Sequence, residues 1–470
     1  MADVRFNRRV SGSYGPVEEG QTVVVVGGGP AGVSCALTVV RLSREAGRSV
    51  RVVLFEGKRF GGRLPHYNQC VGVLSPPIRD ILERQLGVPF PWQLVCRPIT
   101  SYVLHSDNRQ LSLGDEDEVC YAVRRVEFDD YLLEEARSAG VEVVPSRVHD
   151  LEFHADHVVV YSESLSREAA VVVGAFGLDD GAARMFERTT GYRPPRALTS
   201  VVTNIHPEPR FMAEFGNVIH AFLPSIPEIE FGAVTPKSNH LTINVAGRDV
   251  DSPSMERFLR LPSVRAVLPG AETWQRPGDG SGREDLRLFR GRFPVSVAAG
   301  LCGHRYVVIG DAAGLIRPFK GKGINAGLRG GIVAGEAIVR HGVSQSALSS
   351  YLLGHDYARE VLEDRPYAAG LRLLANVGAN CHVLDPVLEL AERDERLRRA
   401  LFYCVSAHQP YRQVVLETVS PGLLLRLAAA VAGEVLRAKG LGLGGTRLRA
   451  GRRSAASQSG ALQPPPAHDA

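Results

Sequence analysis

The chain has 470 residues, which is enough to bury more than one hydrophobic core and predicts two or three domains. A hydrophobic content of 44% and a mean hydropathy near zero are typical of a globular protein, and they exclude a wholly disordered chain or an evident integral membrane protein. The formal net charge of +4 is small for this length, and part of it lies in residues 447–453. The charge therefore indicates no nucleic-acid partner.

The cysteines and the N-terminal residues indicate the compartment. Seven cysteines are scattered along the chain without a CxxC pair, a pattern typical of reduced thiols in a cytosol. Residues 1–20 carry charges throughout and lack the apolar core of a signal peptide, and no segment has the uninterrupted apolar length of a membrane span. We therefore expect a cytoplasmic protein. His220 and His240 lack metal-ligand spacing, so no metal site is predicted.

The predicted elements begin with a β-α-β unit. A β-branched run at residues 22–26 predicts a buried strand, residues 30–42 a helix, and residues 50–55 a second buried strand. This order implies parallel strands. Residues 128–139 then predict an amphipathic helix. Short strands are expected after that helix at residues 141–145, 158–162 and 169–173.

The texture changes in the second half of the chain. Residues 196–292 contain short apolar runs separated by Pro, Asn and Gly, and runs such as 241–245 suit an antiparallel sheet. Residues 306–309 predict another buried strand, followed by a glycine-rich helix. From residue 344 to 439 the pattern is mostly helical, and the Gly-, Arg-, Ser- and Pro-rich remainder predicts a disordered tail.

The turn after the first strand carries the dinucleotide-binding spacing Gly27-x-Gly29-x-x-Gly32. Gly27 permits a tight turn, Gly29 lets the backbone approach a pyrophosphate, and Gly32 lets the helix pack closely on the strand. The spacing alone is weak evidence, because glycine-rich turns are common. Here it follows a buried strand and opens a helix, which is the context that a dinucleotide site requires.

The residues around this turn support the same interpretation. Pro30 and Ala31 begin the helix, whose N-terminal N–H groups and positive dipole suit phosphates. The second strand ends in Glu56, whose carboxylate can accept hydrogen bonds from an adenosine ribose. The alternative is a structural β-α-β turn without a ligand. The agreement of strand, turn, helix and acidic residue favours a dinucleotide.

A second element, far along the chain, identifies the dinucleotide. Asp311 follows a predicted buried strand, where it can bind a ribitol hydroxyl. The helix that begins at Gly323 can direct N–H groups at the N1–C2=O edge of an isoalloxazine, which is negatively charged in reduced flavin. NAD has no such group, so the two elements together imply FAD. The candidate FAD contacts of this second element are Gly310, Asp311, Pro318, Gly321, Gly323, Ile324 and Asn325.

These motifs resemble the p-hydroxybenzoate hydroxylase-like flavoproteins and, within them, the FAD-dependent geranylgeranyl reductase family. The resemblance covers residues 23–337 and rests on the GxGxxG and GDAAG…P…G-x-G-I elements. The stretch Arg125-Val-Glu-Phe-Asp129 matches the family's R-x-x-F-D, which implies that Arg125 faces the FAD. The alternative for Arg125 is a surface charge at a helix cap.

The resemblance also implies a residue beside the reacting centre. Residues 61–72, Gly-Gly-Arg63-Leu-Pro-His-Tyr-Asn-Gln-Cys70-Val-Gly72, are similar to the reductases' cysteine-glycine segment, which passes beside the flavin ring. Arg63 is then a cofactor contact and Cys70 a candidate catalytic residue. The alternative for Cys70 is a small apolar side chain in a protein core.

The chain departs from the family pattern at three places. Residues 174–177 read Gly-Ala-Phe-Gly where the superfamily has Asp-Gly, an aspartate that helps to place FAD and a pyridine nucleotide. Residues 231–236 match the reductases' Y-x-W-x-F-P segment without its tryptophan, which lines the prenyl channel in the family. There is no second Rossmann fingerprint, which is normal in this superfamily. NAD(P)H is the candidate electron donor.

The resemblance implies an FAD-dependent oxidoreductase with a hydrophobic small-molecule substrate. The favoured reaction is reduction of a carbon-carbon double bond of a prenyl-type substrate by hydride transfer from flavin N5. The alternatives are a flavin monooxygenase acting on an aromatic or polyketide-like molecule and, from another class, a non-catalytic FAD-binding lipid carrier. Phe176, at the altered motif, is the residue that favours the lipid-carrier alternative. The sequence leaves the oligomeric state open.

The expected fold class is α/β. It comprises a Rossmann-type FAD-binding domain with a parallel sheet, an antiparallel-sheet substrate domain and a C-terminal helical region. The expected boundaries are 1–20 for a flexible leader, 21–195 with 296–343 for the FAD-binding domain, 196–295 for the substrate sheet, 344–440 for the helical region and 441–470 for the tail.

Residues 421–437 predict a helix that is apolar around most of its circumference. Such a helix is either buried against other helices, which the apolar segment 371–377 favours, or rests on a membrane surface with the basic tail near acidic lipid head groups. In both cases we expect the helices after residue 344 to pack beside the second sheet. An apolar cleft between them should lead to the flavin.

Overall fold

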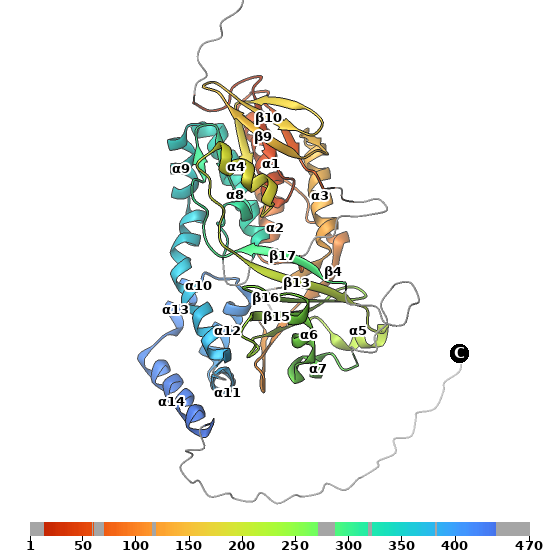
Figure 1. Ribbon diagram of the computed structural model, residues 1–470, viewed down its shortest axis with the longest axis vertical. Helices are drawn as coiled ribbons and strands as arrows, with labels where there is room; N and C mark the ends of the chain where they lie inside the picture. Colours follow the sequence, from red (N-terminus) through yellow and green to blue (C-terminus); the bar gives the residue numbers. More distant parts are fainter. Residues whose placement is uncertain are drawn as a thin grey trace, which may run out of the picture.

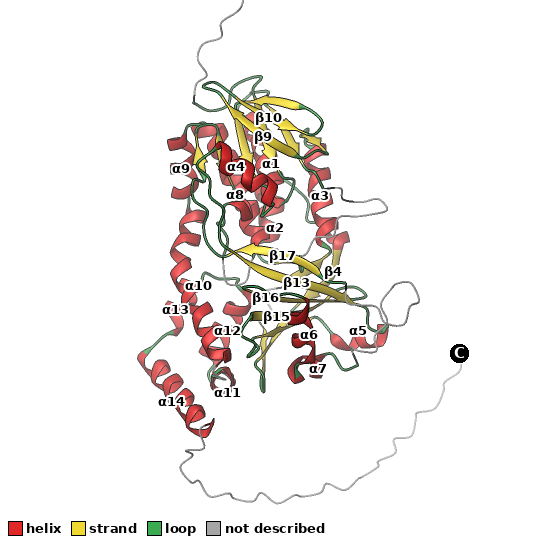
Figure 2. Cartoon of the chain, viewed as in Figure 1, coloured by secondary structure: helices red, strands yellow, loops and turns green. Residues whose placement is uncertain are grey.

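The computed structural model describes residues 14–58, 60, 70–114, 119–270, 287–317, 322–380 and 383–438. Strands gather in an upper and a lower layer, and long helices run along one side of both layers (Figure 1). Figure 2 shows the same division by element type, with the helical column at the left and the strands toward the right. The parallel sheet, the antiparallel sheet and the C-terminal helices confirm the expected α/β class.

Buried β-branched runs build the first sheet. Val23, Val24 and Val25 of its central strand are completely buried. Its neighbouring strands are parallel except for one antiparallel pair at an edge. The strand order is β18 (Cys302–Gly303), β19 (Tyr306–Val308), β12 (Val171–Gly174), β1 (Thr22–Val26), β2 (Arg51–Phe55) and β8 (Glu142–Val144). The order reverses direction at β1, and in open α/β sheets ligands bind beyond the carboxyl end of a strand at such a point.

Two helices pack closely over this sheet because glycines leave their backbones room. They are α1 (Pro30–Glu45), which begins at the first glycine motif, and α8 (Gly323–Glu336), which begins at the second. A Cβ added at Gly331 would lie 2.0 Å from Ser34 Oγ, and one added at Gly335 would lie 2.8 Å from Thr38 Cβ. This contact brings the two motifs, distant in sequence, to the same edge of the sheet.

The second sheet has seven strands in the order β17 (Phe289–Pro294), β13 (Ala197–Ile205), β16 (Leu241–Gly247), β15 (Ile229–Pro236), β14 (Val218–Phe222), β5 (Ser101–His105) and β6 (Gln110–Gly114). Its pairs are antiparallel except for β14 with β5. Alternate side chains of β15 and β16, such as Val234, Ile243 and Val245, form a separate core on one face. The short helices α5 (Pro209–Phe215), α6 (Ser252–Arg260) and α7 (Pro262–Val267) cover that core.

Two strands of this sheet correct the expected domain boundary. Residues 101–114, which the sequence assigns to the FAD-binding domain, form β5 and β6 at one edge of the second sheet. The parallel pairing of β5 with β14, with Tyr102 opposite Ile219, makes the sheet discontinuous in sequence. Strand order depends on pairing between distant segments, which composition and periodicity do not encode.

The remaining elements connect these layers. The three-stranded sheet of β11 (Ser166–Ala169), β10 (Val158–Ser162) and β9 (Val148–Phe153) packs against the first sheet. The sheet of β3 (Val73–Leu74), β7 (Cys120–Val123) and β4 (Val95–Ile99) is antiparallel. The other helices of this part are α2 (Ile78–Asp80), η1 (Ile81–Leu86), η2 (Trp92–Leu94), α3 (Arg125–Ser138), α4 (Asp180–Thr189), η4 (Gly310–Ala312) and η5 (Ala337–His341).

The C-terminal helices are α9 (Gln345–Gly354), α10 (Asp356–Asn380), α11 (Leu384–Arg393), α12 (Glu395–Ser406), α13 (Tyr411–Thr418) and α14 (Pro421–Ala438). Among them, α11 and α12 pack beside the second sheet, as expected, whereas α9 packs on β18 of the first sheet. Leu388, Ala400 and Phe402 share a core with Tyr102 and Leu104 of β5. The contact is therefore a hydrophobic core shared by helices and sheet.

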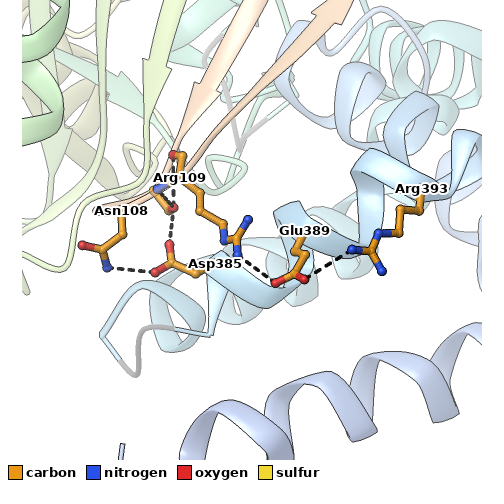
Figure 3. A network of polar contacts seen from close by, with 6 residues as sticks. Asn108, Arg109, Asp385, Glu389 and Arg393 are labelled. Carbon is orange, nitrogen blue, oxygen red and sulfur yellow. Dashed lines mark hydrogen bonds and ion pairs between the residues drawn. The ribbon is translucent and has the colours of Figure 1, made fainter. Parts of the chain in front are cut away.

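A polar network lies at the edge of the contact between the second sheet and the C-terminal helices. Asp385 accepts hydrogen bonds from Ser106 and from Asn108 Nδ2, the latter over 2.8 Å, and Arg109 pairs with Glu389 at 2.8 Å (Figure 3). These contacts join the turn between β5 and β6 to α11. Deeper in the sheet, Glu230 of β15 forms a bidentate ion pair with Arg372 of α10.

Two expectations about the chain ends are corrected. Val17 is buried and donates its N–H to the carbonyl of Ile338, so residues 14–20 of the expected leader are part of the fold. In α14 most side chains up to residue 433 are exposed or half-buried, so the favoured burial of this helix is wrong. The apolar segment of α10 is itself exposed at Leu373 and Leu374 and does not cover α14. Residues 1–13 and the expected tail lie outside the described residues.

Candidate functional site

A single cavity of about 1300 Å³ adjoins both sheets. One part lies at the carboxyl end of β1 and at the starts of α1 and α8, and the other lies against the second sheet. Twelve sequence-predicted residues line it: Gly27, Gly29, Pro30, Ala31, Glu56, Cys70, Arg125, Gly310, Asp311, Gly323, Ile324 and Asn325. Arg63, Pro318 and Gly321 lie outside the described residues.

The glycines of the first turn are of two kinds: at Gly27 and Gly32 a side chain would clash, and at Gly29 it would not. Gly27 has a φ of +110°, and a Cβ there would lie 2.4 Å from the carbonyl oxygen of Ala175. A Cβ at Gly32 would lie 1.9 Å from the carbonyl oxygen of Gly27. A Cβ at Gly29 would meet nothing within 4 Å, because this residue faces the cavity. The turn thus has open space at the start of α1, where the helix dipole favours an anion.

Glu56 lies next to this turn and is held in place by backbone donors. Its carboxylate accepts hydrogen bonds from the N–H of Gly28 at 2.8 Å and from that of Lys58 at 2.7 Å. These bonds anchor the acidic side chain at the end of β2, on the wall of the cavity. A hydroxyl group placed beside the turn would find an acceptor there.

The second motif forms a buried charged cluster. A Cβ on Gly323 would lie 2.8 Å from Asp311 Oδ1, so the carboxyl group lies against the start of α8. Burial raises the pKa of Asp311, and the nearby Arg125 guanidinium opposes that rise. Burial works against the charge of Arg125, but Asp129, Cys70 and Asp311 leave its pKa above the ordinary value. Arg125 pairs with Asp129 at 2.7 Å and is not the exposed helix-cap charge of the alternative interpretation.

Asn325 offers an acceptor without a partner. Its Nδ2 donates to the carbonyl oxygens of Ser75, at 2.9 Å, and Pro76, at 3.1 Å, while its Oδ1 is buried without a hydrogen-bond partner. Buried polar atoms are nearly always satisfied, so an unsatisfied one in a cavity wall indicates a missing ligand group. The open face at Gly29 and this free acceptor fit a long ligand that has a diphosphate at one end and a hydrogen-bond donor at the other. FAD has both groups.

Cys70 lies in the wall of the cavity. Its Sγ accepts a hydrogen bond from the N–H of Gly72 at 3.4 Å, and the side chain is half-buried. It also lies near enough to Arg125 to interact with its charge. Val73 and Ser75, which follow it, also line the cavity.

The part of the cavity against the second sheet has an apolar patch bordered by polar and basic residues, among them Thr199, Ser200, Thr235, Arg290 and Arg292. Ala221, Ala233 and Ala246 lie on three neighbouring strands of its floor, and Phe231 borders them. Val405 and Ser406 of α12 line the cavity as well. The sheet and α12 thus line one cavity, which is continuous with the part that fits FAD.

One polar residue in this floor escaped sequence analysis. Asn244 of β16 is 6% exposed, lines the cavity beside Ala233, and has a buried Oδ1 without a hydrogen-bond partner. The signal was a lone amide within the apolar stretch 241–247, which was interpreted only as a strand. Phe176, at the altered motif, lines the cavity and packs on Phe186 with ring centroids 4.9 Å apart. Among the described residues, no group of His, Cys, Asp and Glu side chains is arranged to hold a metal ion.

Solved structures share this architecture. A flavoprotein/dehydrogenase from Cytophaga hutchinsonii has a TM-score of 0.61 and 18% identity, covering 88% of this chain and 99% of that one. A geranylgeranyl bacteriochlorophyll reductase-like protein from Thermoplasma acidophilum has a TM-score of 0.53 and 17% identity, covering 90% of this chain and 100% of that one. The fold is thus shared with proteins that are named as a flavoprotein and as a reductase-like protein.

The chain is also similar in sequence to curated proteins that are named as reductases. Digeranylgeranylglycerophospholipid reductase 1 of Methanothermobacter thermautotrophicus is 24% identical over 73% of this chain and 82% of the relative. Menaquinone reductase of Mycolicibacterium smegmatis is 27% identical over 72% and 81%, and geranylgeranyl diphosphate reductase of Rhodobacter capsulatus is 24% identical over 67% and 73%. No family model matches the chain. The expected resemblance to the geranylgeranyl reductases is confirmed.

Proposed function

We propose that this protein is a reductase that saturates a carbon-carbon double bond of a hydrophobic, prenyl-type substrate. The observation that carries the proposal is the continuity of the cavity, which joins the site that fits FAD to a region that contains an alanine-lined apolar patch and is also lined by α12. The names of the curated relatives point the same way, because all three are reductases and two act on geranylgeranyl compounds by name.

The chain's own residues would bind and orient the cofactor. We assign the diphosphate to the Gly29 face at the start of α1, the adenosine ribose to Glu56, and the ribitol to Asp311. The N–H groups at the start of α8 would stabilise negative charge on the ring edge, since the positive end of a helix dipole lies there. Bound FAD supplies two-electron hydride chemistry. Arg125 compensates the Asp311 carboxyl group in this buried site.

The remaining wall would shape the reaction space. Cys70, which lines the cavity, would contact the reacting end of the substrate, and the alanine floor would admit an apolar chain while excluding water. The family tryptophan is absent from 231–236, and Ala233 supplies a small side chain in that stretch. We infer a substrate that is bulkier at this point than a bare linear prenyl chain.

The proposal is tested by product mass. Purified protein should be yellow, and reduction with dithionite, NADH or NADPH under anaerobic conditions should bleach it. Geranylgeranyl diphosphate and menaquinone are then added separately. A reductase yields products heavier by two hydrogen atoms for each bond reduced, with return of the yellow colour. Products from menaquinone are reoxidised in air before the mass is measured, because the quinol is also two hydrogen atoms heavier than the quinone. Addition of one oxygen atom in air would instead establish a monooxygenase, and retention of unchanged lipid without recolouring would establish a carrier.

A further inference from the structure

Exposed apolar side chains are concentrated on three C-terminal helices. Ten large hydrophobic side chains are exposed in the described part of the chain; six of them lie on α10, α13 and α14, and a seventh, Val419, directly follows α13. We call these seven the leucine surface: Leu373, Leu374, Val377, Leu416, Val419, Leu424 and Leu425. Leu425 is 72% exposed and Leu374 69%. Isolated exposed leucines are common, but a group of this kind marks an interaction site.

Each helix of the leucine surface packs against another C-terminal helix. α13 packs against α10, and α14 packs against α11. α14 lies at the outer end of the helical column, at the lower left of Figure 1, beyond both sheets. One side of α14 is anchored: Leu423 is buried, and Arg426 pairs with Asp394 of α12 at 2.7 Å. The adjacent Leu424 and Leu425 are exposed, so this helix holds two apolar side chains outward from a fixed position.

The sequence of α14 does not suit a helix in water. Residues 421–433 contain only one charged residue, Arg426, and a helix that is apolar around most of its circumference needs an apolar neighbour. No described part of the chain covers its exposed face. No single described helix is long and apolar enough to cross a membrane, although α13 with residues 421–433 passes that test as a pair bent by 90°. Helices of this length and composition suit the surface of a bilayer, where they lie parallel to its plane.

The charge that follows α14 identifies the kind of surface. The chain continues with basic residues and without an acidic one until near its end: Arg437, Lys439, Arg447, Arg449, Arg452 and Arg453. Juxtaposed apolar and basic segments bind anionic bilayers through two additive terms, apolar insertion and attraction to the head groups. A protein partner would have to present an acidic surface beside its apolar one to match these basic residues.

We propose that the leucine surface docks the protein on an anionic lipid bilayer, with α14 lying in the interface and the basic segment after it contacting acidic head groups. The dock lies on the same helical region that lines the cavity, since α12 carries Val405 and Ser406. The docking proposal does not depend on the reaction, because it rests on exposure and charge outside the cavity.

Vesicle flotation tests the dock. Full-length protein is mixed with phosphatidylcholine vesicles that contain about 30% phosphatidylglycerol, or none, to separate the two terms. Wild-type protein should float with the anionic vesicles. The double variant Leu424→Ser, Leu425→Ser should bind them about tenfold more weakly or worse, because it loses two inserting side chains. Leu353→Ser, which removes an exposed leucine of α9, should float like wild type.

Flavin absorbance shows that each variant is folded, so flotation is read on intact protein. Equal flotation of the double variant and wild type, or no flotation of wild type, would overturn the proposal. Sedimentation tests a second copy of the chain as the occupant. A wild-type dimer that the double variant converts to a monomer, without vesicle binding, would also overturn it. Neither outcome bears on the reductase proposal, which product mass decides alone.

Discussion

Gly29 is the residue at which cofactor binding and folding separate most cleanly. Its missing Cβ would point into the cavity, whereas those of Gly27 and Gly32 would strike the backbone. Gly29→Val should therefore fold and purify without flavin, because the valine side chain occupies the space assigned to the diphosphate. Absorbance and thermal melting check both statements. Gly354→Val, at another glycine with open space, should stay yellow. A fully yellow Gly29→Val protein would refute the assignment of this turn.

Substitution of Cys70 tests whether this residue lies beside the assigned flavin position. Cys70→Ser keeps the shape of the side chain but removes a polarisable sulfur beside the assigned flavin position. We expect a shifted flavin absorbance or reduction potential and slower reduction of the acceptor. Cys96→Ser, at a half-buried cysteine that does not line the cavity, is the control. Identical spectra and rates for the two variants would show that Cys70 only packs.

Asn244 connects stability with binding. Its Oδ1 is buried without a partner, which costs about 1–3 kcal/mol in the ligand-free protein. Asn244→Leu, which keeps the branched shape, should raise the free energy of unfolding by up to that amount and should weaken binding of a substrate that carries a hydrogen-bonding group. Thermal melting and equilibrium binding of menaquinone are the measurements. A destabilised variant with unchanged binding would contradict this role.

At the scale of elements, the pairing of β5 with β14 carries a pH dependence. His105 Nε2 and His220 Nδ1 lie 2.9 Å apart on these strands. Burial, together with the charge of His220, lowers the pKa of His105 to about 3, and burial lowers that of His220 to about 4. Unfolded histidines take up protons near pH 6.5, so below that pH the unfolded state binds more protons and the folded state loses stability.

We therefore expect the free energy of unfolding to fall as the pH drops from about 6.5 to about 4, by an amount on the order of a few kcal/mol. Denaturant melts at several pH values measure this slope. Replacing both residues by asparagine should flatten it, although His240, whose pKa burial lowers to about 4, leaves a residual slope. An unchanged slope in the double variant would exclude the pair as its source.

At the scale of the whole molecule, the C-terminal helices are part of the sheet's core. Leu388, Ala400 and Phe402 share that core with β5 and β14. A chain ending at residue 380 would expose this face, so it should aggregate or be degraded. A chain ending at residue 438 should fold and bind FAD. Expression, solubility and flavin content distinguish the two. A soluble, yellow chain ending at residue 380 would show that the helices form an independent domain.

Features that depend on residues adjacent in the chain were predictable from the order of the amino acids. The valine run of β1, the glycine spacing that follows it and the helix that begins at Pro30 are consecutive along the chain, so their order alone predicts a nucleotide-binding unit. Asp311 and Gly323 were predictable for the same reason, because each lies at the boundary of a local element with a recognisable period.

Tertiary structure decided what depends on partners distant in the chain. The entry of β5 and β6 into the second sheet, the ion pair of Glu230 with Arg372 and the isolation of Asn244 each involve segments far apart in sequence. The exposure of α14 shows most directly what could not be predicted from the sequence. Its apolar sequence demands burial, but whether a helix finds a covering neighbour is a property of the assembled molecule. Among the described residues, no element covers the exposed face of α14. The helix that was expected in the core is therefore a candidate membrane contact.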